Sequence, residues 1–318
     1  MNKKAVFFTS IALLIVSLLL LSFRPRIIEI QSAKTDVHLI RAEIANNYVK
    51  NLNGGFIEGS VKVAAYRALQ AMMQEVSSSG YLNQINSTFE EIFLNGTLNQ
   101  VIIPSMNGFT LKESLEEIEY ISLDFLKIET TFDKEDINVS ITQNNLSGPE
   151  HILVLLDLAY YIDSGVAQWN TSRHFEIPVF IEHLYDPLYI EEFNINIPII
   201  FVRNEVNYSE DEISLSSFIE DMNFIKEPFA PSFLMRLEGD FNESKCCGIE
   251  SPLNPNVLGF TKQHNITYID FCNVSKRCVP DTGQGTLYSI DGITSTVDTE
   301  DYYGFKLDAR HFVKYGVS

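Results

Sequence analysis

The chain has 318 residues, of which 45% are hydrophobic and 12% aromatic, a composition typical of a globular protein with a sizeable buried core. It holds 42 acidic residues against 23 Lys and Arg, which gives a formal net charge of −19. Because an acidic surface repels phosphate backbones, we expect no nucleic acid among its partners.

An uncharged apolar segment follows the first four residues and runs from Ala5 to Phe23. As a helix, its 19 residues extend about 28 Å, close to the hydrocarbon thickness of a bilayer. A secretory signal peptide has a shorter apolar core and a small-residue cleavage site, and the Arg-Pro-Arg sequence after Phe23 provides none. We therefore predict a short cytoplasmic tail at 1–4 and an uncleaved transmembrane helix at 5–23, with a cleaved leader and a buried core helix as alternatives.

Residues 24–130 are predicted to form a mainly helical, membrane-proximal part on the extracellular side. Within 27–52, the residues Ile30, Val37 and Ile44 recur every seven positions, as on one face of a helix. Such a face can pack on its own domain or associate with the same helix of a second copy. The sequence leaves both alternatives open.

Other local patterns predict where helices begin and end in this part of the chain. Asn53-Gly54-Gly55 is typical of a helix end. Thr110 and Glu113 have the spacing of a capping box, in which each residue satisfies a backbone N–H of the other at the start of a helix. Hydrophobic periodicity predicts further helices at 61–76, 82–94 and 110–128.

Residues 131–318 are predicted to form a mainly antiparallel β-sheet domain, which makes the whole chain α+β. Apolar residues alternate in 137–143, as in a half-buried strand. The segments 151–162 and 166–184 read as a long hairpin that turns at Gly165. The remaining predictions are strands at 194–202 and 232–241, a short helix at 214–224, and short β segments near 283–285 and 291–292.

Glycosylation sequons, Asn-X-Ser/Thr, occur nine times, whereas the contents of Asn, Ser and Thr would place about three or four by chance. This excess favours a glycosylated segment outside the cell and therefore sets the orientation of the anchor. The predicted acceptors are Asn86, Asn95, Asn138, Asn145, Asn170, Asn207, Asn242, Asn265 and Asn273.

All four cysteines, Cys246, Cys247, Cys272 and Cys278, lie close together in the sequence. In an exported segment, such a cluster indicates a disulfide-stapled loop. We expect the adjacent pair to bridge to Cys272 and Cys278, because the Cβ directions of neighbouring residues diverge, and both such pairings remain open. A zinc site is the alternative, although neither spacing matches the usual chelating pairs.

No catalytic, cofactor-binding or metal-binding motif is present in the sequence, so we expect no cofactor and no metal. His183 with Asp186 and Asp308 with His311 have a spacing that could share a metal or a proton, but a turn and a surface ion pair explain them equally well. Carboxylates are plentiful, for example at Glu116–Glu117 and Glu191–Glu192, so a glycosidase-type pair remains an alternative.

Several short segments resemble an uncharacterised family of archaeal membrane-anchored surface proteins. The segments are FLNGT (93–97), DPLY (186–189), APSFLMRLEG (230–239), GIES (248–251) and FKLDARHFVKYGV (305–317). The start of the chain is also similar to archaeal type IV pilin-like proteins, although cleavage after Ala5 would place Ser10 where those proteins have Glu. The resemblance implies an anchored surface protein and transfers no catalytic residue.

We therefore expect a non-enzymatic, single-pass cell-surface glycoprotein that acts by protein–protein interaction in the cell envelope. A more specific form of this hypothesis makes it an accessory of a pilus-like assembly. Its expected partners are other envelope or pilus-like proteins, or a second copy bound through 27–52. The alternatives are an anchored extracellular hydrolase that acts on envelope polysaccharide or peptide, and a ligand-binding module.

Overall fold

The computed structural model describes residues 33–202, 212–254, 257, 267–276, 278, 288–294 and 304–315. The chain divides into two compact units, Met1–Ile44 and Ala45–Ser318, and the first described helix crosses the boundary between them. The helices are α2 (Ala33–Asn51), α3 (Ile57–Ser79), α4 (Ile85–Asn95), α5 (Leu111–Ile121), α6 (Pro187–Phe193), α7 (Glu212–Asp221), α8 (Phe233–Glu238), α10 (Asp270–Ser275) and α11 (Ala309–Lys314). The strands are β1 (Thr97–Leu98), β2 (Val101–Ile102), β3 (Glu129–Phe132), β4 (Asn138–Thr142), β5 (His151–Asp163), β6 (Gln168–Phe180), β7 (Ile225–Lys226), β8 (Ile249–Glu250), β9 (Tyr288–Thr294) and β10 (Gly304–Leu307).

The predicted transmembrane segment 5–23 lies outside the described residues, as do the sequons at Asn207 and Asn265 and the predicted β segment near 283–285. Within the part of the chain that the structure describes, no helix is both long enough and apolar enough to cross a bilayer. The segment near 291–292 falls within β9, at a shift in the register with β10 between Ile290 and Thr294.

The helix end predicted at Asn53-Gly54-Gly55 is wrong. A π-helical turn, Leu52–Phe56, joins α2 to α3, and the flanking residues Asn51 and Ile57 keep right-handed helical dihedrals. The Asn53 side chain donates to Val49 O at 2.8 Å and accepts a hydrogen bond from Tyr160, while Leu52 and Ile57 are fully buried. Tertiary packing therefore holds the chain in helical form across two glycines that locally favour a stop.

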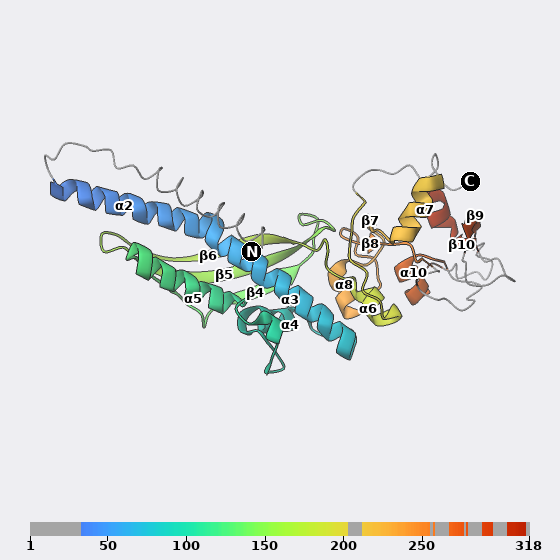
Figure 1. The fold of residues 1–318 in the computed structure, drawn as a ribbon, viewed down its shortest axis with the longest axis horizontal. Coiled ribbons are helices and arrows are strands. Elements are labelled where there is room, and N and C mark those ends of the chain that lie inside the picture. Colours follow the sequence, from blue (N-terminus) through green and yellow to red (C-terminus); the bar gives the residue numbers. More distant parts are fainter. Residues whose placement is uncertain are drawn as a thin grey trace, which may run out of the picture. The chain divides into compact units, whose positions relative to one another are not determined.

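The hairpin predicted to turn at Gly165 is confirmed and forms the centre of the largest sheet (Figure 1). β5 and β6 pair antiparallel over their whole length, from Asp163 opposite Gln168 to His151 opposite Phe180. On its other edge, β5 pairs antiparallel with β3 and with β4. At the turn, Gly165 has a φ of +76° and its N–H donates to Asp163 Oδ1 at 2.7 Å, an arrangement that favours glycine.

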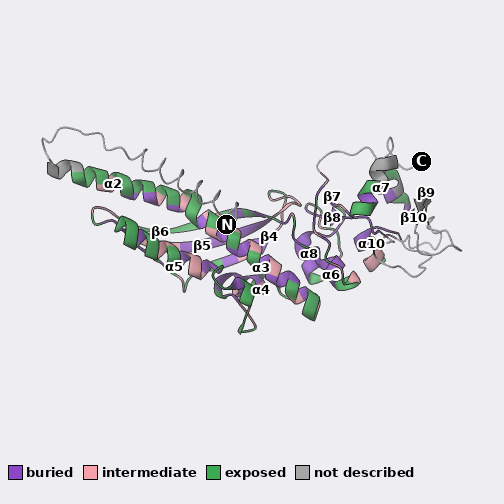
Figure 2. Ribbon diagram, viewed as in Figure 1, coloured by how far each residue is buried: buried purple, intermediate pink, exposed green. Residues whose placement is uncertain are grey.

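Helices cover one face of this sheet: α3 packs on β6, α4 on β4 and α5 on β3. Alternate residues of β5, from Ile152 to Ile162, are buried against them, and α3 contributes small side chains such as Ala64 and Ala68 that allow close packing. Figure 2 shows the contrast between the buried side of α3 and the largely exposed stretch of α2 from Val37 to Ile44. The capping box of Thr110 and Glu113 at the start of α5 is confirmed.

Two strand predictions in the C-terminal half are wrong. The segment 194–202 forms only single bridges, Tyr185 with Pro198 and Phe201 with Phe224, because Pro198 has no N–H to donate to a ladder. Residues 233–238 form α8 rather than a strand. Ser232 caps the start of this helix by accepting a hydrogen bond from Met235 N, and Gly239 ends the helix with a φ of +70°. Both ends are therefore marked by local capping residues.

The structure is α+β with antiparallel sheets, as the sequence predicts. The first strand longer than two residues, β3, begins at Glu129, near the point where the sequence changes from helical to alternating periodicity. The division into four segments proposed from the sequence, 1–4, 5–23, 24–130 and 131–318, stays a prediction.

Candidate functional site

Six of the predicted glycan acceptors are exposed: Asn86, Asn95, Asn138, Asn145, Asn170 and Asn242. They lie on helices, strands and loops; Asn138 is on β4 and Asn170 on β6, the strands that flank part of β5. Asn273 differs in being half-buried, and its Nδ2 donates to the backbone at Thr267 O at 3.0 Å, whereas the Nδ2 atoms of the exposed Asn138 and Asn242 donate to carboxylate side chains. A glycan on Asn273 would be joined to its Nδ2.

The predicted cysteine pairing is wrong. Cys246 bonds to its neighbour Cys247, with 3.7 Å between the Cα atoms, and Cys272 bonds to Cys278, with 5.2 Å between the Cα atoms. Lys276, at the end of α10, has a φ of +58° and turns the chain so that Cys278 returns to Cys272. Each cysteine thus pairs with the one nearest in sequence, since closing a short loop orders less of the chain than joining segments about 25–30 residues apart.

A fully buried cluster of charges, here named the arginine cluster, joins α6, α8 and α10. Arg236 of α8 donates through the same guanidinium nitrogen to Asp186 Oδ2 at 2.9 Å and to Asp270 Oδ2 at 2.7 Å, and all three side chains are inaccessible to solvent. Its other terminal nitrogen donates to Ile249 O. Asp186 also caps α6 by accepting from Leu188 N at 2.9 Å. One side chain therefore ties together three helices and the start of β8.

Two carboxylates share a single guanidinium in the arginine cluster, which leaves an excess negative charge if both are ionised. Burial, together with the neighbouring Asp186, raises the pKa of Asp270 to about 6 despite the charge of Arg236. Burial raises the pKa of Asp186 as well, although Arg236 and the backbone N–H groups of Tyr189 and Leu188 oppose this effect. The pKa of Arg236 is raised above its ordinary value because both carboxylates outweigh the effect of burial.

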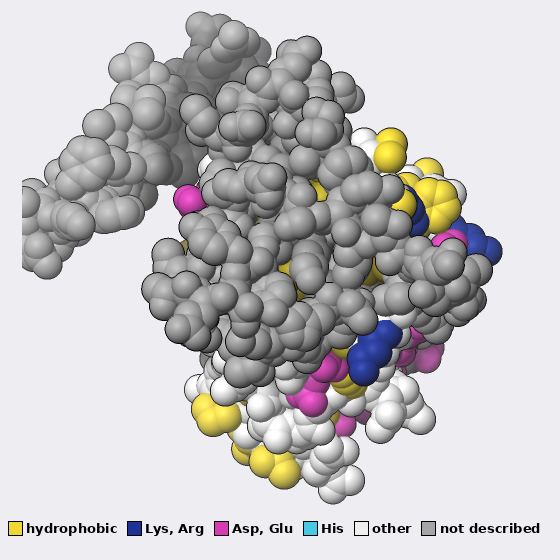
Figure 3. Space-filling view, turned by 90° about the vertical axis from the view of Figure 1, so that its right-hand side faces the viewer, with side chains coloured by type: hydrophobic (Ala, Val, Ile, Leu, Met, Phe, Trp, Pro, Cys, Tyr) yellow, Lys and Arg dark blue, Asp and Glu magenta, His cyan; other side chains and the backbone are white. Residues whose placement is uncertain are grey.

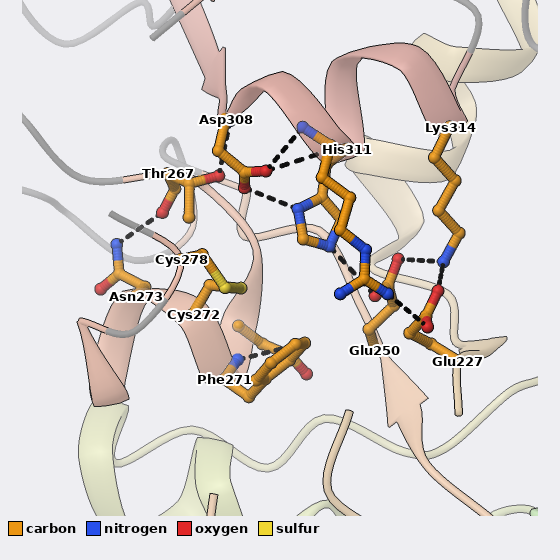
Figure 4. The surroundings of a disulfide bond; sticks show 12 residues. Glu227, Glu250, Thr267, Phe271, Cys272, Asn273, Cys278, Asp308, His311 and Lys314 are labelled. Atoms are coloured by element: carbon orange, nitrogen blue, oxygen red, sulfur yellow. Dashed lines mark hydrogen bonds and ion pairs between the residues drawn. A yellow bond between two sulfur atoms is a disulfide. The ribbon is translucent and has the colours of Figure 1, made fainter. Parts of the chain in front are cut away.

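A second group of charges, here named the histidine cluster, joins α11 to β8 and to the segment after β7 (Figure 4). The imidazole of His311 lies between two carboxylates, with Nδ1 at 2.6 Å from Asp308 Oδ2 and Nε2 at 3.3 Å from Glu250 Oε2. Lys314 Nζ donates to Glu250 Oε1 at 2.7 Å and to Glu227, which also accepts from Arg310 at 2.7 Å. Tyr315 OH donates to Glu250 Oε1 at 2.6 Å.

The alternative interpretation of Asp308 and His311 as a surface ion pair is wrong, because His311 is 1% exposed. Burial alone would lower its pKa, but hydrogen bonds to Asp308 and Glu250 raise the pKa of His311 to about 9. Burial likewise opposes the ionisation of Glu250, yet His311 and Lys314 hold the pKa of Glu250 at about 2. With the imidazole protonated, the three cations of the histidine cluster balance its three carboxylates.

The disulfide Cys272–Cys278 lies beside the histidine cluster (Figure 4). Both sulfurs and a carboxylate oxygen of Asp308 are within 4.8 Å of one another, and they form the one metal-compatible group among the residues that the structure describes. In the disulfide form the sulfurs are bonded to each other and provide no thiolate. Asp308 is also engaged, since one oxygen caps α11 and the other accepts from His311. This geometry favours a structural role for Asp308.

The structure separates His183 and Asp186, the other His–Asp pair that the sequence offered as a possible metal or proton-sharing site. Asp186 is buried in the arginine cluster, whereas His183 is exposed and has a φ of +70°. The carboxylates at 191 and 192 are exposed on α6, and Glu192 accepts a hydrogen bond from Tyr81 OH at 2.9 Å. On the described part of the face in Figure 3, Asp and Glu side chains lie beside Lys and Arg rather than forming a separate acidic field.

Neither charge cluster has the geometry of a catalytic site. Both ring nitrogens of His311 are occupied, so the imidazole has no free nitrogen that could accept a proton from a substrate. Arg236, Asp186 and Glu250 are inaccessible to solvent and contact other protein groups. The clusters instead join α6, α8, α10 and α11 to the two-stranded β7–β8 sheet, which supports a stabilising role.

Sequence reasoning did not find these clusters, although most of their residues, Glu227 and Asp270 apart, lie in segments that it had singled out. Asp186 is in DPLY, Arg236 in APSFLMRLEG, Glu250 in GIES, and Asp308, His311 and Lys314 in FKLDARHFVKYGV. Charged residues inside otherwise apolar segments were the available indication of buried ion pairs. Comparison of the chain with family models, with curated proteins and with solved structures gives no match.

Proposed function

We propose that the chain is an anchored, glycosylated protein of the cell exterior that acts by associating with other envelope proteins, beginning with a second copy of itself. The apolar segment 5–23 is its anchor, and the part from residue 24 onward lies outside the membrane. In this proposal, α2 and the folded part after it present surfaces to other envelope or pilus-like proteins. The proposal includes no catalytic step.

The exterior location is supported by the glycan acceptors and the cysteines. Six acceptor side chains, which lie on α4, β4, β6 and two loops, are exposed and therefore open to a modifying enzyme. The four described cysteines are paired in two disulfides, which persist in oxidising surroundings. Both features belong to the same part of the chain, downstream of the proposed anchor.

The association is supported by an apolar stripe on α2, defined here as Val37, Ile40 and Ile44, and this is the observation that carries the proposal. The three side chains are 61%, 57% and 45% exposed. Their spacing of three and four places them on one helical face. If 5–23 anchors each copy in the same bilayer, the α2 helices of two copies run parallel, and their stripes can pack as in a two-stranded coiled coil.

The test compares Ile40→Ser with Leu39→Ser in the full chain, held in detergent micelles, by light scattering coupled to size-exclusion chromatography. Leu39 is 64% exposed but lies off the stripe, so it is a matched control. We expect a dimer whose dissociation constant rises about a hundredfold or more with Ile40→Ser, because each of the two copies loses the burial of one aliphatic side chain, which contributes about 1.5–3 kcal/mol. Leu39→Ser should leave the dissociation constant of the dimer unchanged. A monomeric parent chain, or equal effects of both changes, would refute the proposed association.

A further inference from the structure

A cavity of about 450 Å³ lies between α3 and the segment that leads into α6. This volume is within the range of small-molecule sites. The residues that matter for its chemistry are Arg67, Gln70, Gln74, His183, Tyr185 and Asn196. We propose that this cavity binds a small polyhydroxylated anion, such as an acidic sugar. The inference goes beyond the envelope role proposed above and does not depend on it.

Arg67 provides the cationic group of the cavity. Its guanidinium donates to Gln70 Oε1 at 3.3 Å and lies 4.7 Å from the centre of the Phe109 ring, so its contacts among the described residues are with neutral groups. Several other cations among the described residues pair with carboxylates; Lys62, for example, pairs with Glu58 at 2.6 Å. The planar fork of a guanidinium matches a carboxylate or a phosphate in two parallel hydrogen bonds.

His183 is held at the cavity by an unusual backbone conformation. Its φ of +70° lies in the left-handed region, which non-glycine residues adopt rarely. The surrounding hydrogen bonds impose this conformation: His183 N donates to Ile199 O at 2.9 Å, and Ile199 N donates to Leu184 O at 2.7 Å. Strained residues that the fold holds in place occur preferentially at binding sites.

The rest of the lining suits a ligand with hydroxyl groups. The amides of Gln70, Gln74 and Asn196 each offer donors and acceptors, and the Tyr185 ring adds an aromatic surface. Among the described residues that line the cavity, none is Asp or Glu, although the chain has 42 acidic residues. A carboxylate or phosphate group can therefore approach Arg67 and His183 without a competing acid in the lining.

The experiment titrates the full chain with glucuronate, glucose 6-phosphate and glucose, and follows binding by isothermal titration calorimetry. A polyoxyethylene detergent keeps sugar headgroups out of the sample. We expect at least one of the two anions to bind more tightly than glucose, and the stronger one identifies a carboxylate or a phosphate as the recognised group. Arg67→Gln should weaken binding of that anion about tenfold, because a charge-assisted hydrogen bond is lost.

Two matched controls separate recognition from a general change of charge. Lys62→Gln removes a cation from the same helix outside the cavity, and should not alter binding. His183→Asn keeps a residue that tolerates the left-handed conformation but removes the imidazole, and should weaken binding; His174→Asn on β6 should not. The inference is overturned if neither anion binds at about 10 mM, or if Arg67→Gln and Lys62→Gln have the same effect.

Discussion

His311 shows how one residue couples the stability of this chain to pH. Its pKa in the folded protein, about 9, is above the ordinary value of 6.5. The folded state therefore binds the proton more tightly, and the resulting stabilisation is complete below pH 6.5 and disappears as the pH rises through 9. Glu250 has the opposite dependence: with a folded pKa of about 2 against 4.5, its contribution is present above pH 4.5 and is lost as the pH falls through 2.

We predict that His311→Gln lowers the free energy of unfolding by about 2–3 kcal/mol at pH 7, because the loss of a stabilised imidazolium leaves Asp308 and Glu250 with less positive charge. At pH 10 the parent imidazole is neutral, and the difference between the two proteins should be much smaller. Urea unfolding at pH 7 and at pH 10 measures the difference in the free energy of unfolding between the two proteins. His174→Gln is the control, since His174 pairs with Asp157 on an exposed strand and should contribute less than about 1 kcal/mol. A difference that did not change with pH would assign the effect to packing.

The arginine cluster responds to pH in the opposite sense to Glu250. Asp270 has a folded pKa of about 6, above its ordinary value of 3.8. Its stabilising contribution is therefore complete below pH 3.8 and is lost as the pH rises through 6. The raised pKa of Asp270 is consistent with an Arg236 side chain that two buried acids share. At the scale of single residues, the two clusters thus favour different pH ranges.

At the scale of elements, the contact between β8 and the segment after β7 depends on a glycine. Gly248 directly precedes β8, and its carbonyl accepts from Glu227 N at 2.9 Å. A Cβ atom built on Gly248 would lie 2.1 Å from Ala230 O and 2.2 Å from Glu227 O. These are backbone atoms, so no side-chain rotation can make room. The close approach positions Glu227 and Glu250 for the histidine cluster.

We predict that Gly248→Ala lowers the free energy of unfolding by about 3 kcal/mol or more, or prevents folding, because backbone segments must separate to admit a methyl group. Gly59→Ala is the matched control: its added Cβ meets no atom within 4 Å, and it lies within α3, where alanine favours the helix by about 0.5–1 kcal/mol. Circular dichroism and urea unfolding of both variants test this. Equal stability of Gly248→Ala and the parent chain would contradict the observed backbone contact.

Helix α8 shows why the type of an element was harder to predict than its presence. The apolar residues of 232–241 fit either a short buried strand or one side of a short helix, and periodicity cannot separate the two over so few positions. The hydroxyl cap at Ser232 and the left-handed Gly239 were the features that favoured a helix. The long hairpin of β5 and β6 was predicted correctly, because its alternation extends over many residues on both sides of a glycine turn.

At the scale of the whole molecule, the distribution of exposed acceptors predicts an uneven pattern of glycosylation. We expect Asn170, exposed on β6, to carry a glycan in the native protein and Asn273 to remain largely bare. Asn273 Nδ2 donates to Thr267 O at 3.0 Å, within a loop that the Cys272–Cys278 disulfide closes. Mass spectrometry of proteolytic peptides measures the occupancy of each site. Equal occupancy at Asn273 and Asn170 would mean that modification precedes formation of the disulfide loop.

The local features of this protein follow from the sequence by itself. The capping box at Thr110, the turn at Gly165 and the helical periodicity of α3 each depend on residues within a few positions of one another, and the sequons are defined by three adjacent residues. For the same reason, the sequence predicts the α+β class and the approximate order of helices and strands.

Only the tertiary structure decided which distant residues meet. The burial of His311 against Glu250 and the continuation of α2 through Gly54 and Gly55 both depend on packing with remote segments. Local propensities differ by only about 1 kcal/mol per residue, so tertiary contacts of several kcal/mol override them. A charged residue in the sequence is equally compatible with a solvated surface and with a buried ion pair. The tertiary structure decides between them, because a charge is buried only where the fold places an oppositely charged group beside it.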